Sequence, residues 1–177
     1  MKRTNNHNII LGTLFLTSVM LGIATPSQSY TVKRSHTSSY DRQVAQSTII
    51  NTAALEDSVF QQINSYRATQ NLPALLRNSA IDTQARSHSQ NMASGKVRFG
   101  HDGFVQRVQA TRLFYILAAE NVAYNRGYQD PAKQAVQGWL KSPGHLNNIK
   151  GQYNLTGIGV ASNSKGEIYF TQIFIRV

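Results

Sequence analysis

The chain contains no cysteine among its 177 residues. Disulfides hold together many small extracellular domains that cannot build a sufficient core. Without them, this chain must be stabilised by apolar packing alone, and about 125 residues are enough for one such core. The same absence excludes lipid attachment at a lipoprotein-type cysteine.

Acidic residues are few: 8 acidic side chains stand against 18 basic ones, for a formal net charge of +10. A positive surface predicts attraction to anionic partners such as wall polymers, acidic polysaccharides or lipid head groups. The basic residues are scattered singly and form no nucleic-acid motif, so we interpret them as a solvated basic surface. Most of the arginines are Arg67, Arg77, Arg86, Arg98, Arg107, Arg112 and Arg126.

Long apolar runs are confined to residues 9–24, which follow the positive charges of Lys2 and Arg3. This run is shorter than the roughly 20 residues that a membrane span needs. We therefore predict a cleaved signal peptide at residues 1–29 rather than a retained membrane anchor, with small residues that suit cleavage after Ser29 or after Ala24. The expected location is secreted, either extracellular or periplasmic, with no transmembrane span after cleavage.

Residues 30–52 are rich in Ser and Thr, lack sustained periodicity, and are predicted to be a flexible linker. The remainder, 53–177, is predicted to be one domain. Apolar spacing and capping residues predict helices at 53–70, 79–94, 104–110 and from 131, and strands at 118–124, 156–161 and 167–175.

The last predicted strand is apolar on both faces, so both faces need cover. One face carries Ile168, Phe170 and Phe174, and the other carries Tyr169, Ile173 and Ile175. Helices before and between the strands supply that cover. The predicted fold class is therefore α+β, an α-β-α sandwich with a small, mostly antiparallel sheet between helical layers.

His101, Glu120 and His145 lie at the ends of predicted elements, where polar side chains can converge in a cleft. Two imidazoles and a carboxylate suit a zinc-like divalent ion with open positions, or metal-free acid–base chemistry. Structural alternatives remain: His101 stabilising its glycine-rich turn, Glu120 accepting backbone N–H groups, and His145 packing in the first turn of its helix. In that turn the helix dipole favours a neutral imidazole.

Three further residues are interpreted structurally. His88 lies on the apolar face of a helix and is expected to pack in the core with one hydrogen bond. Ser142 precedes a proline and is expected to be an N-cap, not a nucleophile. Asn121 is expected to bond backbone.

Five short motifs follow one another in order along the chain. They are Phe99-Gly100-His101, Ala119-Glu120-Asn121, Trp139 with Ser142-Pro143-Gly144-His145, Gly157-Ile158-Gly159, and Tyr169-Phe170-Thr171-Gln172. In these motifs the chain resembles the CAP superfamily, which joins cysteine-rich secretory proteins, antigen 5 allergens and pathogenesis-related proteins. It is most similar to the cysteine-free bacterial SCP-like branch, and the resemblance covers about residues 55–175.

The resemblance implies an α-β-α sandwich whose central cleft is lined by histidines and acids and binds zinc in some members. By motif, His101, Glu120 and His145 are the cleft residues, and His101 and His145 are the expected metal ligands. Eukaryotic members carry a further histidine where this chain has Tyr169, and an acid where it has Ser142. Their four-residue set is therefore incomplete here.

The expected function is a secreted, non-enzymatic module that binds lipid, wall polymer or another extracellular ligand, with a cleft suited to a divalent metal. One alternative is a metal-dependent, peptidase-like hydrolase with Glu120 as base. Another is a purely structural extracellular module. The sequence carries no nucleophile signature that would favour an enzyme. The fold does not favour one either, since a shared fold does not imply a shared activity.

Overall fold

The computed structural model describes residues 50–177; the predicted signal peptide and nearly all of the predicted linker lie outside the described residues. Five helices and four strands make up this part of the chain. In order they are α2 (Thr52–Thr69), β1 (Leu76–Arg77), α3 (Ser79–Ala93), α4 (Phe104–Ala110), β2 (Leu117–Arg126), α5 (Pro131–Lys141), α6 (Pro143–Lys150), β3 (Leu155–Ser162) and β4 (Glu167–Arg176).

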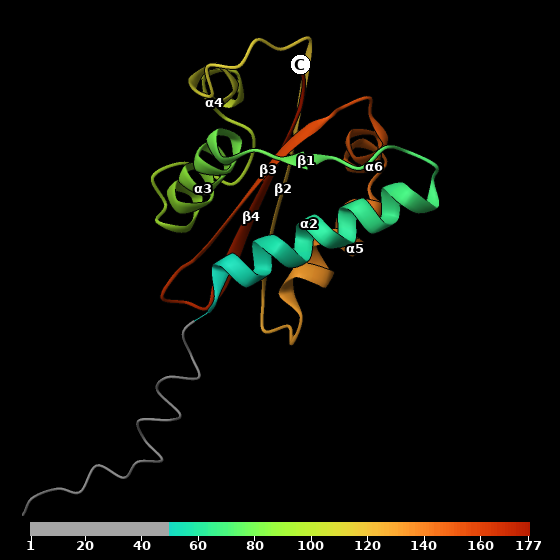
Figure 1. Cartoon of the computed structure of the whole chain (residues 1–177). Helices are drawn as coiled ribbons and strands as arrows, with labels where there is room; N and C mark the ends of the chain where they lie inside the picture. The colour runs from blue at the N-terminus through green and yellow to red at the C-terminus, as the bar shows by residue number, and fades with distance from the viewer. Residues whose placement is uncertain (1–49) are drawn as a thin grey trace, which may run out of the picture. The chain divides into compact units, whose positions relative to one another are not determined.

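The four strands form one sheet in the order β1-β3-β4-β2. The β1–β3 pairing is parallel, and the β3–β4 and β4–β2 pairings are antiparallel. α3 and α4 lie on one side of the sheet, and α2, α5 and α6 lie on the other (Figure 1). The predicted sandwich with a mostly antiparallel sheet is confirmed.

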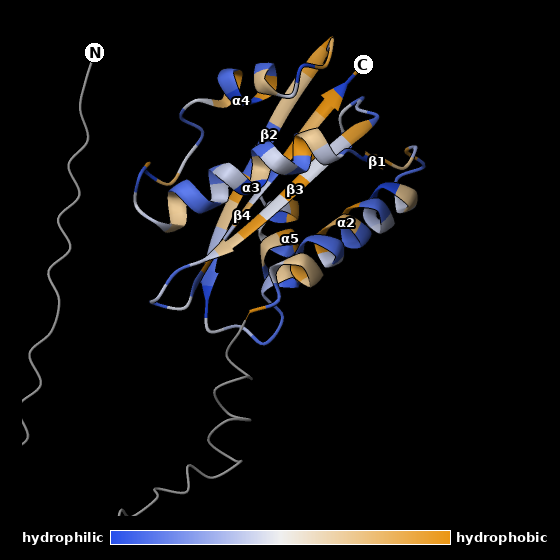
Figure 2. Cartoon of the chain, turned by 60° about the vertical axis from the view of Figure 1, so that its left-hand side comes forward, coloured by the Kyte–Doolittle hydropathy of each residue, from blue (hydrophilic) through white to orange (hydrophobic). Residues whose placement is uncertain are grey.

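Two apolar clusters fill the spaces between the layers. The larger joins α2, α5 and α6 to the sheet around Trp139, Phe170 and Phe174. The smaller joins α3 and α4 to the opposite face around Ile173 and Ile175. β4 is therefore buried on both faces, as its sequence predicts, and the apolar strands lie between amphipathic helices (Figure 2).

Two glycines let α3 lie directly on the sheet. A Cβ atom at Gly157 would meet the backbone of Ile81 and Asp82, and one at Gly159 would lie 2.0 Å from the backbone nitrogen of Arg86. Real side chains do not approach this closely. The Gly-x-Gly pattern of β3 thus sets how closely α3 packs against the sheet.

Carboxylates extend the hydrogen bonding of β3 where the two-residue β1 ends. Asp82 Oδ1 accepts from the backbone nitrogen of Ile158 at 2.8 Å, and Glu56 Oε1 accepts from that of Val160 at 3.2 Å. Arg77 and Arg86 pair with these carboxylates. Buried polar groups need such partners, because an unpaired buried charge is costly.

The interpretation of the arginines as a solvated surface is wrong for three of them, Arg67, Arg77 and Arg107. Arg67 is 1% exposed and donates to four backbone carbonyls, those of Pro73, Ile149, Gly151 and Tyr153. Arg77 and Arg107, whose side chains are 21% and 11% exposed, pair with carboxylates. Arg86 also pairs with a carboxylate, but its side chain is 45% exposed and remains at the surface. The planar, five-donor guanidinium can satisfy several acceptors at once, which suits it to such interior positions. The scattered positions of the arginines along the sequence do not reveal which of them are buried.

Capping agrees with prediction at Asp130, whose carboxylate accepts from the backbone of Lys133 at 2.9 Å ahead of α5. It differs at Ser142, whose side chain makes no capping hydrogen bond. Ser142 both ends α5 and precedes α6. Ser142 therefore occupies the N-cap position of α6 as predicted, but its hydroxyl does not bond the helix, and the residue lines the groove described below.

Candidate functional site

Glu120 lies in β2 with its side chain 1% exposed, and its two carboxylate oxygens are both occupied. Arg107 of α4 donates to Oε2 from Nε at 2.9 Å and to Oε1 from Nη2 at 2.7 Å. His101, in the loop before α4, places Nδ1 3.0 Å from Oε1. Bidentate arginine–carboxylate pairs are among the stronger hydrogen-bonded pairs in proteins. The structure therefore brings His101 and Glu120 together, and adds Arg107.

His145 lies in the first turn of α6, and two asparagines attach that turn to β2. Asn121 donates from Nδ2 to the His145 carbonyl at 3.2 Å. Asn148 donates to Asn121 Oδ1 at 2.8 Å and to the Glu120 carbonyl at 3.2 Å. Asn121 thus bonds backbone as expected, although its partner belongs to α6. These bonds position His145 relative to the strand that carries Glu120.

Burial lowers the pKa of His145, and the nearby charge of His101 lowers it further. The imidazole is therefore neutral near pH 7, the form that can bind a metal. The direction agrees with the expectation from the sequence, but burial is the main cause. His88 is confirmed as a core residue: it is 2% exposed, and its Nε2 bonds the Gly100 carbonyl at 2.8 Å.

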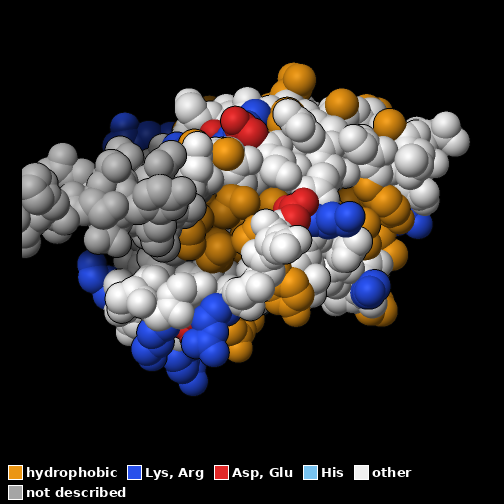
Figure 3. Space-filling model, turned by 90° about the horizontal axis from the view of Figure 1, so that it is seen from below, with side chains coloured by type: hydrophobic (Ala, Val, Ile, Leu, Met, Phe, Trp, Pro, Cys, Tyr) orange, Lys and Arg blue, Asp and Glu red, His pale blue; other side chains and the backbone are white. Residues whose placement is uncertain are grey.

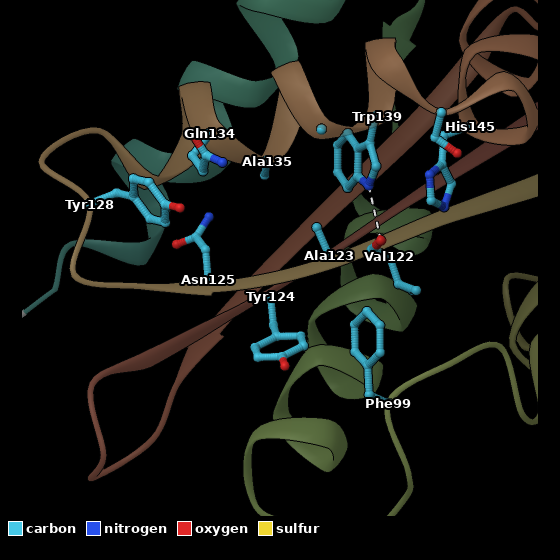
Figure 4. A pocket seen from close by; sticks show the side chains of 12 residues that line it. Phe99, Val122, Ala123, Tyr124, Asn125, Tyr128, Gln134, Ala135, Trp139 and His145 are labelled. Atoms are coloured by element: carbon cyan, nitrogen blue, oxygen red, sulfur yellow. Dashed lines mark hydrogen bonds between the residues drawn. The ribbon is translucent and has the colours of Figure 1, made fainter.

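A groove of about 510 Å³ runs between β2 and α5, and His145 lies at one end of it (Figure 4). We call this the β2–α5 groove. It is lined by Phe99, Val122, Ala123, Tyr124, Asn125, Tyr128, Gln134, Ala135, Gly138, Trp139, Ser142 and His145. His101 and Glu120 are not in this lining. The three candidates thus lie close together, but only His145 faces the groove.

Tyr169, which stands where eukaryotic relatives carry histidine, takes no part in the His101–Glu120 pair. Its ring stacks on that of Tyr124 with centroids 5.6 Å apart, and its hydroxyl donates to Glu167 Oε2 at 3.1 Å. Phe99 meets Tyr124 edge-on at 5.1 Å. The position therefore belongs to an aromatic row beside the groove.

The chemistry of the donors fits a metal in part. His101 gives Nδ1 to a carboxylate and leaves Nε2 open, the arrangement by which proteins orient a ligating histidine. Its side chain is 51% exposed. Among residues 50–177, however, no group of three His, Asp or Glu side chains is arranged to hold a metal ion.

The sequence interpretation missed Arg107 and Asn148, which hold the site together. A buried carboxylate requires a cation partner, and this requirement is the one signal that points to an arginine. It cannot choose among Arg98, Arg107 and Arg112, which precede Glu120 by 22, 13 and 8 residues, because separation in sequence does not show which of them packs against the strand.

The fold and site define a class: an α-β-α sandwich with a histidine–carboxylate pair near a groove of aromatic and uncharged polar side chains. Residues 60–174 match the family model described as CAP, the cysteine-rich secretory protein family. The chain belongs to this family. No helix within residues 50–177 is long and apolar enough to cross a membrane.

Two bacterial relatives share about a third of their aligned residues with this chain. The uncharacterized protein YkwD of Bacillus subtilis is 32% identical over 128 residues, covering 70% of this chain and 48% of its own length. An extracellular SCP-domain protein of Bacillus anthracis is 30% identical, with a TM-score of 0.60 over 71% of this chain and 41% of its own. The chain thus spans less than half the length of either relative.

An outer surface protein of Borrelia burgdorferi shares the fold at 18% identity. Its TM-score is 0.63, covering 72% of this chain and 96% of its own.

Proposed function

We propose that this protein is a secreted, non-enzymatic CAP module that binds a wall polymer or another extracellular ligand. The observation that carries the proposal is the state of Glu120, whose side chain is 1% exposed and whose two oxygens are held by Arg107 and His101. A general base must have an oxygen free for the proton it removes. This arrangement favours binding over the hydrolase alternative, in which Glu120 is the base.

The surface charge supports an anionic extracellular partner. Removal of residues 1–29 would take away Lys2 and Arg3 and leave 16 basic against 8 acidic side chains, a net charge of +8. Seen from below, Lys and Arg side chains around an apolar hollow outnumber acids (Figure 3). The extracellular and outer-surface descriptions of two structural relatives are consistent with export of this chain.

In this proposal the same site binds zinc through His101 and His145, the two histidines that the family resemblance implies as metal ligands. Glu120 would then act indirectly, orienting His101 through Nδ1. Zinc bound to two histidines would supply open coordination positions for an oxygen or nitrogen of a ligand. The role of this chain's residues is to hold a neutral His145 and an oriented His101 in place.

Binding of the purified chain to isolated bacterial wall fragments tests the proposal. We expect co-sedimentation that weakens as salt rises from 50 to about 500 mM, because salt screens exposed charges. Release of soluble fragments without added enzyme would contradict the non-enzymatic assignment. Absence of binding to walls and to anionic polysaccharides alike would contradict the binding role.

Zinc is tested separately by calorimetric titration of the same chain. We expect heat of binding that is lost in the double variant His101→Ala, His145→Ala and kept in Arg98→Ala, a change at an exposed site. Equal heats in all three proteins would remove zinc from the proposal.

A further inference from the structure

The β2–α5 groove combines aromatic surface with neutral polar groups. Of its twelve lining residues none is Asp, Glu, Lys or Arg. Phe99 and Tyr124 present exposed rings, 48% and 54% accessible, although aromatic side chains normally lose most of their surface on folding. A ligand recognised here therefore carries no net charge at the contact and has flat apolar faces.

The polar groups of the groove include one that has no partner. Asn125 is 8% exposed and projects from β2 toward α5 on the same side as Tyr128, whereas Tyr124 projects from the other side of the strand (Figure 4). Its Nδ2 donates to the Pro131 carbonyl at 2.9 Å, while its Oδ1 accepts no hydrogen bond from any described residue. Buried polar atoms are nearly always paired. A donor on a bound ligand, directly or through one water, would satisfy this acceptor.

The edge of β2 argues against a peptide that adds a strand. Such a peptide needs free backbone groups along the edge. Here the Val122 carbonyl accepts from Trp139 Nε1 at 3.0 Å, and the Glu120 carbonyl accepts from Asn148. Two outward carbonyls of the strand are thus already bonded by α5 and α6. The groove is also open and polar along Asn125, Gln134 and Ser142, unlike the closed apolar tunnel that would bury a lipid chain.

We propose that the β2–α5 groove binds an uncharged saccharide chain, with sugar rings against Tyr124 and Phe99 and hydroxyl or acetamido groups bonded to Asn125 and Gln134. Sugar rings offer apolar CH faces to stack on aromatic rings and many donors for amide oxygens. This inference rests on the proposed wall-binding function and names the part of the polymer that the groove recognises. The basic surface supplies long-range attraction, and the groove supplies the short-range contact.

Gly138 provides a way to block the groove without disturbing the fold. It lies in α5 on the groove lining, and a Cβ atom there would meet nothing within 4 Å. Gly138→Leu places a side chain in the groove, and Gly138→Ala adds only a methyl group as the matched control. Tyr124→Ala removes the central ring. Tyr115→Ala is its control, since Tyr115 is also exposed, at 41%, and lies outside the groove.

The test is titration of the full chain with a β-1,4-linked N-acetylglucosamine tetrasaccharide, followed by NMR and calorimetry. We expect the side-chain amide of Asn125 to shift and that of Asn163 to stay unchanged. Gly138→Leu and Tyr124→Ala should weaken binding about tenfold or more, equivalent to about 1.4 kcal/mol. Gly138→Ala and Tyr115→Ala should bind within about twofold of the parent chain.

Unchanged affinity for the saccharide in both Gly138→Leu and Tyr124→Ala would overturn the proposal. It would also be overturned if the Asn125 amide resonance shifted with an uncharged peptide or with phosphatidylcholine vesicles but not with the saccharide. Wall binding measured in parallel separates the two claims. If Gly138→Leu and the parent chain bind walls equally tightly, the saccharide site in the groove is wrong but the wall-binding function stands. If neither protein binds walls, both proposals are wrong.

Discussion

At the scale of single residues, Arg107 makes the burial of Glu120 tolerable. Removing one partner of a buried ion pair leaves an uncompensated charge and typically costs about 3–5 kcal/mol. We therefore expect Arg107→Ala to lower the free energy of unfolding by about that amount in urea titrations. The loss should also be visible as broadening or shift of the His101 ring resonances, because Glu120 is then free to move.

The control for this variant is Arg98→Ala. Arg98 is an exposed arginine only 3.6 Å from Asp102, itself exposed, and surface pairs of this kind contribute little. The free energy of unfolding should stay nearly unchanged in this control. If Arg107→Ala proved as stable as Arg98→Ala, the pairing described for Glu120 would be wrong.

Arg67 makes a different prediction, because its partners are carbonyls rather than acids. Burial lowers the pKa of its guanidinium, yet four carbonyls share its N–H groups. Arg67→Lys keeps the charge, but one ammonium cannot reach acceptors spread over this span. We expect a loss of about 2–4 kcal/mol in the free energy of unfolding. A lysine variant with an unchanged thermal midpoint would contradict this account.

Residue chemistry could be predicted from the sequence only where it depends on local pattern. His88, on an apolar helical face, and Asp130, before a proline, were predictable for this reason. Arg67, Arg107 and Asn148 instead bond to groups in loops, strands or other helices, at sequence separations that follow no helical or strand period. Their roles follow from how helices and strands pack, which spacing along the chain does not contain.

At the scale of elements, the contact between α3 and β3 depends on a glycine pair. Gly159→Ala places a methyl group within 2.4 Å of three backbone atoms of α3. Because backbone cannot move aside as a flexible side chain can, α3 must shift outward and loosen the smaller core cluster. We expect a loss of at least about 3 kcal/mol in the free energy of unfolding, the upper range for overpacking.

Gly138→Ala is the matched control for that substitution, since it adds the same methyl group to open space within a helix. Relief of the glycine penalty should stabilise the protein by about 0.5–1 kcal/mol. Opposite signs for the two variants in thermal unfolding are the expected result. Equal effects would show that the close approach of α3 is not what requires glycine in β3.

The longer elements could be predicted because their apolar periodicity and caps are local. α3 begins at Ser79 as predicted and ends within one residue of the predicted position. β1 was not predicted: it is two residues long and exists through its parallel pairing with β3. The bonds from β3 to the carboxylates of Glu56 and Asp82 could not be predicted either, since these residues lie in helices far away in sequence.

At the scale of the whole molecule, charge is divided between an interior set and an exposed set. Most of the acids in the described residues pair with arginines or cap backbone. Exposed cations such as Arg98 remain available to anionic partners, and interior arginines such as Arg67 do not. Net charge therefore overstates the attraction to a wall polymer, and salt dependence of wall binding should reflect fewer contacts than +8 suggests.

The interior histidines predict how the stability of the whole domain responds to pH. Burial lowers the pKa of His88 below 6.5, Arg107 and His101 lower it further, and Glu120 and the Gly100 carbonyl oppose them. Above pH 6.5 the imidazole is neutral in both states and carries no cost. As pH falls below 6.5 the unfolded chain takes up a proton that the folded chain resists. The free energy of unfolding then drops by up to about 1.4 kcal/mol per pH unit, and the drop ends below the lowered pKa.

His88→Gln removes this titration while keeping a side-chain donor for the Gly100 carbonyl. Urea titrations at pH 7.5 and 5.0 should show a smaller loss of stability in the variant than in the parent chain. Part of the loss remains, because the pKa of His145 is lowered as well. The double variant His88→Gln, His145→Gln should flatten the response further. Equal pH dependence in parent and double variant would mean that these imidazoles titrate alike in the folded and unfolded chain.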